Sequence, residues 1–328
     1  MAMALPLLAQ TDWEVVKIFQ IGGQGGWDYL TVDPQTHRLY VPRSTHTMVI
    51  DAETGKTIAD ISGQKNAHGV ALAPAAGRGF ISDGGGDGAV VIFDLKTYAV
   101  LGSLAAMPDA DGIIFDPTSG HVLVVSGRGK AMMSFKPDID PKNGKIDPPI
   151  ALRGEPEFLA SDGVGNVYIN LMDTQEVAVV DFKARKVLAN WPVAPGGLPV
   201  GMAIDAKNGR LFIGCRGPEK LIVMSTKDGK VLSDMPIGAS VDAVKLDRGQ
   251  AFASTAGSQL FVASEKTSGK FEIVQTVKTA EGARTMGVDP MTHRIYLPAA
   301  EYETGANGRR AVKPGSFMIV VVARKSEK

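Results

Sequence analysis

Short apolar runs separated by turn-forming residues dominate this chain. Runs of about five apolar or β-branched residues recur throughout, each bounded by Gly, Asn, Asp or Pro, as at residues 38–42 and 89–94. Runs of this length with such flanks predict β-strands rather than helices. The 38 glycines agree with many tight turns, because glycine adopts the positive φ that such turns need. The pattern therefore predicts an all-β protein.

One unit is repeated along the chain. Its clearest copies are residues 33–42 (DPQTHRLYVP) and 289–298 (DPMTHRIYLP), and five weaker copies lie between them. The aligned positions of the seven copies are Asp33, Ala73, Asp116, Asp162, Asp205, Asp247 and Asp289. They recur about every 40 to 46 residues, a period typical of propellers and solenoids.

The count of strands separates these two architectures. Each unit predicts four strands, except that the last unit lacks its fourth, and a matching pattern occurs instead at residues 13–21. A solenoid gains nothing from this arrangement, whereas a propeller uses the N-terminal strand to complete its last blade and remove two exposed sheet edges. We therefore predict an all-β, seven-bladed β-propeller over residues 12–325, a ring closed by the N-terminal strand joining the last blade.

The repeat motifs resemble a known family. The segments VDP (32–34), RLYVP (38–42), VID (49–51) and TGK (54–56) are similar to those of the YncE-like, YVTN-repeat seven-bladed β-propellers. The resemblance covers about residues 12–325 and implies the fold. Related propellers occur in bacterial surface and periplasmic proteins, and the wider superfamily includes lactonases and electron-transfer subunits. Because the motif residues are strand and turn residues, the resemblance implies no particular activity.

The first ten residues differ from the rest. Residues 1–10 (MAMALPLLAQ) form a short apolar run before a small residue, typical of the end of a secretory signal. The alternative is a disordered start. The run is shorter than the roughly 20 residues that span a bilayer, so no membrane span is expected. We expect a signal-peptide remnant and a periplasmic or secreted protein, in which the lone Cys215 would need burial to stay reduced.

Propeller geometry brings polar residues to the mouth of the central channel, on its top face. His68 lies at the start of a first strand, and His46 lies in a predicted top loop of the neighbouring blade. The other first strands bring carboxylates to the same mouth, from Asp28, Asp111, Glu157 and Asp242. Imidazoles with carboxylates suit zinc or another divalent metal, and His46, His68 and Asp111 are the candidate ligands. Either histidine could instead be a general base, or these residues only solvate the mouth.

Basic side chains also map to the top face. The four arginines predicted there are Arg43, Arg128, Arg216 and Arg284. Converging guanidinium groups suit a carboxylate, sugar acid or phosphate, unless each pairs with a neighbouring Asp or Glu. Residues 301–315 lengthen the top loop of the last blade and carry Tyr302, Arg309 and Arg310. Long polar loops on a rigid scaffold often carry function, so we expect a lid or partner-binding loop there.

Three functions stay open. The first is an exported propeller that binds a small, anionic ligand or a protein partner at the top face of the channel. The second is a lactonase-like hydrolase or isomerase that uses His46 or His68 as its base, with or without a divalent metal as cofactor. The third, nucleic-acid binding, is disfavoured, because 35 basic and 35 acidic residues cancel and leave no overall field that attracts phosphate.

Overall fold

The chain is built of β-strands. The computed structural model describes residues 13–304 and 309–325. These residues contain one short 3-10 helix, η1 (Pro74–Ala76), and no α-helix, which confirms the all-β prediction. No helix among the described residues is long and apolar enough to cross a membrane. Residues 1–10, interpreted above as a signal-peptide remnant, lie outside the described residues.

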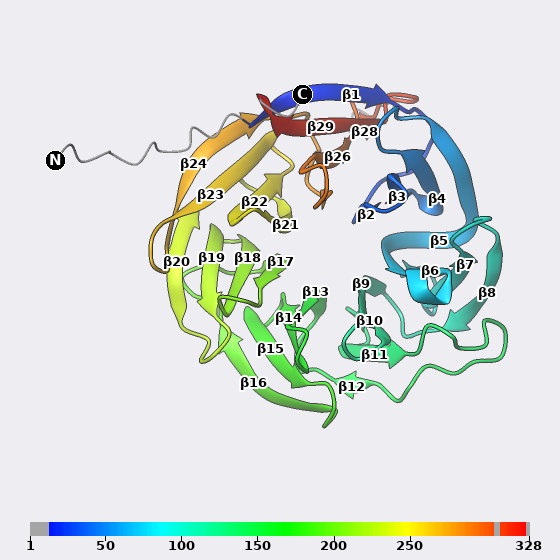
Figure 1. The fold of residues 1–328 in the computed structure, drawn as a ribbon, viewed down its shortest axis with the longest axis horizontal. Coiled ribbons are helices and arrows are strands. Elements are labelled where there is room, and N and C mark those ends of the chain that lie inside the picture. The colour runs from blue at the N-terminus through cyan, green and yellow to red at the C-terminus, as the bar shows by residue number, and fades with distance from the viewer. Residues whose placement is uncertain (1–12, 305–308, 326–328) are drawn as a thin grey trace.

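Antiparallel sheets stand side by side around a central axis (Figure 1). Four of the sheets in the described chain have four consecutive strands, and the first strand of each lies nearest the axis. These sheets contain β9 (Ala110–Asp116), β10 (His121–Ser126), β11 (Ala131–Phe135) and β12 (Ile150–Ala151); β13 (Pro156–Ser161), β14 (Asn166–Leu171), β15 (Glu176–Asp181) and β16 (Lys186–Pro192); β17 (Pro199–Asp205), β18 (Arg210–Arg216), β19 (Glu219–Ser225) and β20 (Val231–Pro236); and β21 (Val241–Asp247), β22 (Gln250–Thr255), β23 (Gln259–Thr267) and β24 (Lys270–Lys278).

The longest strand joins two repeats. β5 (Thr57–Ala73) pairs with β4 along its first part and with β6 along its second, which makes one seven-stranded sheet. The other strands of this sheet are β2 (Thr31–Asp33), β3 (Arg38–Pro42), β4 (Ser44–Asp51), β6 (Arg78–Asp83), β7 (Ala89–Asp94) and β8 (Val100–Ala105). The sequence predicted two separate strands, at 57–61 and 69–73. They form one strand because the residues between them also stay extended, with shifts of register against both partners.

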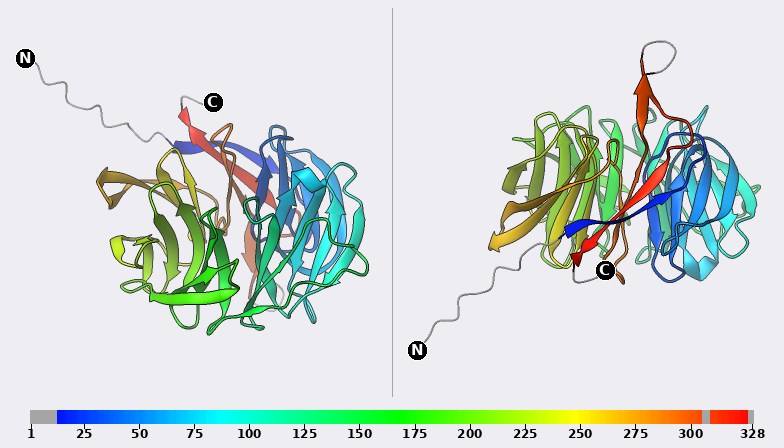
Figure 2. Two further views of the ribbon diagram at one scale, coloured as in Figure 1. Left: turned by 60° about the horizontal axis from the view of Figure 1, so that its bottom comes forward. Right: turned by 90° about the horizontal axis from the view of Figure 1, so that it is seen from above.

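Strands from the two ends of the described chain pair with each other. The order of their sheet is β1 (Trp13–Gln20), β29 (Met318–Arg324), β26 (Ile295–Ala299) and β25 (Gly287–Val288). β1 and β29 are antiparallel, with Trp13 opposite Arg324. Figure 2 shows the two strands, blue and red, lying against each other.

Repeated aspartates hold the tight turns that follow the inner strands. Asp289 Oδ1 accepts hydrogen bonds from the backbone N–H groups of Met291, over 2.8 Å, and Thr292, over 3.2 Å. The carboxylate thereby satisfies donors that the turn leaves unpaired. His293 and its counterpart His37 occupy left-handed positions in these turns, with φ of 59° and 54°. The most strongly repeated motif therefore specifies turn geometry.

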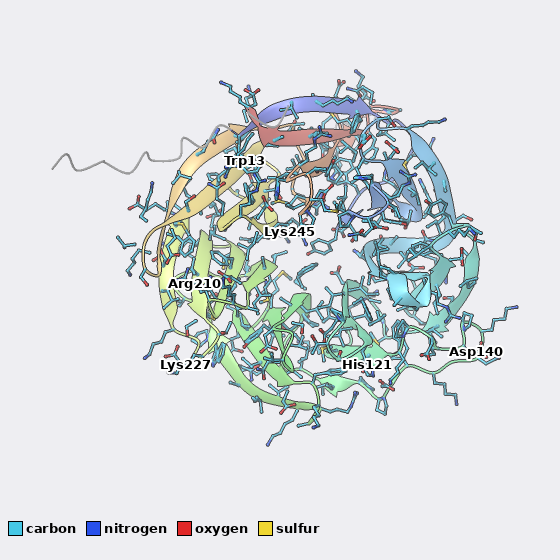
Figure 3. All side chains as sticks on the ribbon, in the orientation of Figure 1. Trp13, His121, Asp140, Arg210, Lys227 and Lys245 are labelled. Carbon is cyan, nitrogen blue, oxygen red and sulfur yellow. The ribbon has the colours of Figure 1, made fainter. Side chains whose placement is uncertain are left out.

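The apolar core lies between neighbouring sheets, where side chains from two sheets interdigitate (Figure 3). Phe80 and Phe135 come from different sheets and meet edge to face, with ring centroids 5.4 Å apart. Trp13 meets Phe252 of the adjacent sheet in the same way, at 5.0 Å. Full burial of a large apolar side chain contributes about 3 kcal/mol. This packing fixes the inner strands, whose starts carry the polar residues described next.

Candidate functional site

Charged side chains meet at one end of the central axis. They line a cavity of about 500 Å³, here called the mouth cavity. Its charged lining residues are Asp28, His68, Asp111, Glu157, Arg216, Asp242 and Arg284. All of these except Arg216 lie five positions before the aligned turn position of their repeat, and the remaining repeat has Val200 there. One position of the repeat therefore brings a ring of polar groups together, as the sequence predicted for His68 and the carboxylates.

His68 joins two carboxylates in this cavity. Its Nδ1 donates a hydrogen bond to Asp28 Oδ2 over 2.7 Å and lies 3.6 Å from Asp111 Oδ1. The other ring nitrogen, Nε2, is 2.7 Å from the side-chain amide of Asn66. Burial alone would lower the pKa of His68, but the hydrogen bond to Asp28 and the charge of Asp111 outweigh it and raise the pKa to about 9. His68 is therefore an imidazolium at neutral pH.

Two carboxyl groups in the cavity have oxygen atoms that accept no hydrogen bond within the described residues. Asp111 Oδ1 is buried without a hydrogen-bond partner among the described residues. Burial, which outweighs the opposing charge of His68, raises the pKa of Asp111 well above its usual range. Glu157 makes no hydrogen bond or ion pair within the described chain. Burial raises its pKa to about 7, against the opposing charge of Arg216.

Asp242 holds two arginines of the mouth cavity. Arg284 Nε donates to Asp242 Oδ2 over 2.5 Å, and Arg216 pairs with the other carboxylate oxygen. Arg216 Nε also donates to the carbonyl oxygen of Val241 over 3.0 Å. The Nη1 group of each guanidinium makes no hydrogen bond within the described residues. Each arginine therefore has its orientation fixed and keeps donors for a ligand.

Three residues could hold a cation. The ligand atoms of Asp28, His68 and Asp111 lie within 4.8 Å of one another, and they form the candidate metal group found among the described residues. Two carboxylates with one imidazole suit zinc or manganese. A metal ion bound there would displace the proton that Nδ1 of His68 donates to Asp28, so its affinity would rise with pH.

His46 lies outside this group. It belongs to β4, where it pairs with Ser62 of β5, and its Nε2 is 3.8 Å from Asp60 Oδ2. It does not line the mouth cavity, and the candidate metal group contains Asp28 where the sequence analysis expected His46. The sequence predicted a top loop at His46, but residues 44–51 form the strand β4. Pairing of β4 with β5 places His46 opposite Ser62.

Arg43 also differs from the prediction, because its guanidinium holds a loop together. The residue is 1% exposed and donates to the carbonyl oxygens of Gly26, over 2.9 Å, and Gly25, over 3.0 Å. Its guanidinium carbon lies 3.5 Å from the centre of the Phe317 ring. Gly25 has φ of 96°, and a Cβ there would lie 2.3 Å from the carbonyl oxygen of Arg43. The glycine backbone of this loop thus allows the close contact with Arg43. Arg43 does not line the mouth cavity.

Two further residues singled out by the sequence lie outside the mouth cavity. Arg128 is exposed in the turn between β10 and β11 and is not a lining residue. Cys215 is buried, and burial raises the pKa of its thiol to about 12. Neither residue is placed to act on a ligand in the mouth cavity.

A hairpin of the last repeat rises beside the cavity. It consists of β27 (Tyr302–Thr304) and β28 (Arg310–Val312), and it projects beyond the sheets (Figure 2). Arg310 stacks on the ring of Tyr302, 3.8 Å from its centre, and pairs with Glu281. Tyr302 lines a smaller cavity of about 270 Å³ that shares three charged residues with the mouth cavity. The exposed Arg309 directly precedes β28.

Two axial residues were missed by the sequence analysis. Tyr29, 8% exposed, lies next to Asp28, and Lys245 lies further along β21. Lys245 stands two positions before the aligned turn position of its repeat. The same position in the other repeats holds Thr31, Ala71, Ile114, Ala160, Ala203 and Gly287. Position-by-position comparison of the repeats would have singled out Lys245, because it is the one charged residue in the set.

Comparisons with known proteins define the class. No protein-family model and no curated protein matches the chain. Among solved structures, it is similar to hydrazine synthase from Kuenenia stuttgartiensis, with a TM-score of 0.71 and 12% identity over 89% of this chain and 96% of that one. It is also similar to the WD40 β-propeller domain of Doa1, with a TM-score of 0.72 and 12% identity over 96% and 98% of the two chains. The chain is therefore a β-propeller, and identity this low shows the fold alone.

Proposed function

We propose that this chain is a single-domain, seven-bladed β-propeller that binds a small ligand in the mouth cavity. Seven aligned repeats support the number of blades, and the pairing of β1 with β29 supports a ring closed by the N-terminal strand. The strand and turn motifs support a place in the YncE-like, YVTN-repeat group.

Unused polar groups that line the mouth cavity support the proposal. Asp111 and Glu157 have free acceptors, while Arg216 and Arg284 keep free donors. Buried polar groups in proteins are nearly always hydrogen-bonded, so groups left unpaired around a cavity suit a ligand that pairs with them. A small molecule with a carboxylate that accepts from the arginines and hydroxyl groups that donate to the acidic residues would pair with all four side chains. A sugar acid has this chemistry.

Titration calorimetry with galacturonate tests this function, with galactose as the analogue that lacks the carboxylate. Wild type should bind the acid at least tenfold more tightly than the sugar. Arg216→Met and Glu157→Gln should each weaken binding of the acid about tenfold, equivalent to about 1.4 kcal/mol. Arg128→Met, at an exposed arginine outside the cavity, should leave it unchanged. Equal affinities of wild type and both cavity variants would contradict the proposal.

A second function, hydrolysis or isomerisation, is favoured by the pKa of Glu157. A carboxyl group with a pKa near 7 can both accept and donate a proton at neutral pH. In a lactonase-like reaction, Glu157 and His68 would move protons at the mouth cavity. Asp28, His68 and Asp111 are the residues that would hold a divalent metal, which supplies polarisation of a carbonyl oxygen or of water when bound.

Elemental analysis of protein purified without chelator tests the metal-dependent version. We expect near-stoichiometric zinc or manganese in wild type and its loss in His68→Ala. His46→Ala is the matched control, because His46 lies outside the candidate group, and it should keep the metal. Wild type free of metal at pH 8 would contradict metal dependence and leave ligand binding as the function.

A protein partner at the top face is an alternative occupant. The projecting β27–β28 hairpin and the likeness to a WD40 domain support it. We further propose export to the periplasm or the medium, on the basis of the apolar run at residues 1–10. Cell fractionation tests this, and recovery with a cytoplasmic marker would contradict it. Nucleic-acid binding stays the least favoured function, and steeply salt-dependent DNA retention would revive it.

A further inference from the structure

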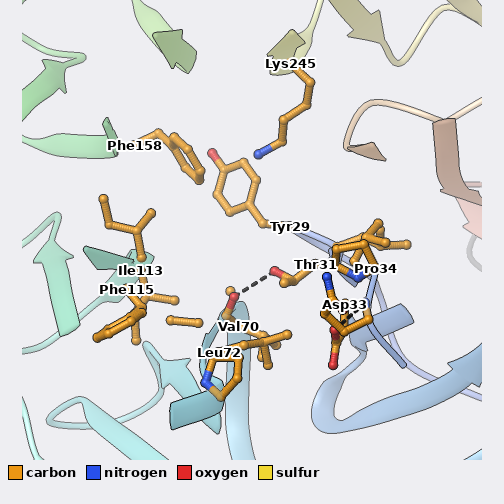
Figure 4. A pocket seen from close by; sticks show the side chains of 17 residues that line it. Tyr29, Thr31, Asp33, Pro34, Val70, Leu72, Ile113, Phe115, Phe158 and Lys245 are labelled. Atoms are coloured by element: carbon orange, nitrogen blue, oxygen red, sulfur yellow. Dashed lines mark hydrogen bonds between the residues drawn. The ribbon is translucent and has the colours of Figure 1, made fainter. Parts of the chain in front are cut away.

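A second cavity lies deeper along the axis. Its volume is about 420 Å³, and it extends from Tyr29 to the turn residues 33–35 at the opposite end of the inner strands. Tyr29 is the one lining residue that it shares with the mouth cavity. Most of its wall is apolar, with Val70, Ile113, Phe115 and Phe158 facing inward (Figure 4). We call it the axial cavity.

Lys245 places a single unpaired cation in this apolar wall. No ion pair or hydrogen bond within the described residues engages its ammonium group, which lies 5.1 Å from the centre of the Phe158 ring. Asp33, the carboxylate of the same cavity, is already occupied by Gln35 N–H and the Thr36 hydroxyl. The charge of Lys245 therefore has no counter-ion in the fold.

The surroundings make this isolation costly. Burial lowers the pKa of Lys245 to about 8, so most molecules still carry the charge at neutral pH. A partly buried charge without a counter-ion is unfavourable, and a contact with an aromatic ring offsets only part of the cost. The Tyr29 hydroxyl also makes no hydrogen bond in the described chain, and Tyr29 lines the same cavity between Phe158 and Lys245 (Figure 4). Two groups that can donate hydrogen bonds to a ligand thus line this apolar cavity.

We propose that the axial cavity is a second ligand site, which takes a small apolar monocarboxylate with its carboxylate on Lys245 Nζ and its hydrocarbon body against Val70, Ile113 and Phe115. The Tyr29 hydroxyl donates to the same carboxylate. The volume is within the range of about 300 to 1,000 Å³ that small-molecule sites occupy. The site uses no charged group of the mouth cavity, so it stands whether or not that cavity binds a sugar acid.

Calorimetric titration with octanoate at pH 7 tests the proposal. Wild type should bind octanoate saturably and at least tenfold more tightly than octanamide, which has the same chain without the charge. Lys245→Met keeps the length of the side chain and removes the ammonium, and it should weaken octanoate binding at least tenfold. Lys266→Met, at an exposed lysine of β23, should bind like wild type. No saturable binding by wild type, or unchanged binding by Lys245→Met, would overturn the proposal.

Two more variants separate this site from the mouth cavity and from a folding defect. Arg216→Met should leave octanoate affinity within twofold of wild type, because Arg216 does not line the axial cavity. Ile113→Trp, which fills the cavity and leaves every charge in place, should weaken octanoate binding as Lys245→Met does. Loss of octanoate binding in Arg216→Met but not in Ile113→Trp would assign the binding to the mouth cavity and overturn the proposal.

Discussion

His68 Nδ1 donates a hydrogen bond to Asp28 Oδ2 over 2.7 Å, and the two residues stand 40 positions apart, at the same place in successive repeats. The pair therefore links β5, which contains His68, to the residues just before β2, the inner strand of the neighbouring repeat. It also helps to explain why His68 keeps its charge at neutral pH although it is largely buried, since Asp28 and Asp111 together stabilise the imidazolium more than burial disfavours it.

Removal of this hydrogen bond should shift the titration of His68. In Asp28→Asn, burial is opposed only by Asp111 and more distant carboxylates, so we expect the pKa of His68 to fall clearly below its wild-type value of about 9. Histidine NMR titration measures it. Asp60→Asn, beside His46, is the control and should leave the pKa of His68 unchanged. A pKa that stays near 9 in Asp28→Asn would show that Asp28 is not its cause.

The same pair makes stability depend on pH. The pKa of His68 is about 9 in the folded protein and 6.5 for the free side chain. Its stabilising contribution is therefore complete below pH 6.5 and is lost as pH rises through 9. We expect Asp28→Asn to be less stable than wild type in urea at pH 6.5 and the difference to shrink by pH 10. A difference independent of pH would contradict this assignment.

Glu157 should show a stability effect at lower pH. Its pKa is about 7 in the fold and 4.5 for the free side chain, so the folded state binds more protons between these values and stability falls as pH rises through them. Glu157→Gln should therefore melt about 3 °C or more above wild type at pH 8 and at the same temperature at pH 4. Glu53→Gln, at an exposed glutamate, should change neither value. Equal melting of Glu157→Gln and wild type at pH 8 would argue against a buried, unpaired carboxylate.

Arg43 should matter for stability and not for binding. Arg43→Met removes the donor to the carbonyl oxygens of Gly25 and Gly26 and the contact of the guanidinium with the Phe317 ring, a loss of about 1–3 kcal/mol in the free energy of unfolding. Arg128→Met, at an exposed arginine, should cost less than about 0.5 kcal/mol. Urea denaturation measures both. Similar stability of the two variants would mean that the loop contacts contribute little.

Trp13 should anchor the first strand. Its indole is 2% exposed, packs against Phe252 and donates to Gln250 Oε1 over 3.0 Å. Trp13→Ala should lower the free energy of unfolding by about 3–5 kcal/mol. Ile18→Ala, on the same strand but 47% exposed, should cost less than about 1 kcal/mol. If both changes cost the same small amount, β1 would contribute little to the stability of the sheet.

The strands were predictable because turn chemistry fixes where they begin. β3, β6 and β10 start at Arg38, Arg78 and His121, the residues that the repeat motif predicted. The continuous β5 was not predictable in this way. Its middle residues include Gly63 and polar side chains, which indicate a loop when taken alone, and only pairing with both neighbours keeps them extended.

Site residues were predictable where they followed the repeat and not where a single loop decided. One position of the repeat is shared by His68, Asp111, Glu157 and Asp242. Once the start of one inner strand was predicted, the location of all four residues therefore followed. Arg43 depends on glycines of residues 22–26 whose left-handed backbone turns carbonyl oxygens inward, and residue spacing does not encode such a conformation. Lys245 was missed because it belongs to no motif, and its charge stands out only when the same strand position is compared across the repeats.

The pairing of Trp13 with Arg324 has a mechanical consequence. Because β1 and β29 are antiparallel, the outer ends of both strands lie at the same edge of their sheet. Tension applied to the two ends of the described chain would therefore load the ladder of hydrogen bonds one rung at a time, as in opening a zipper, and not all rungs together. Under force, the molecule should open first at β1.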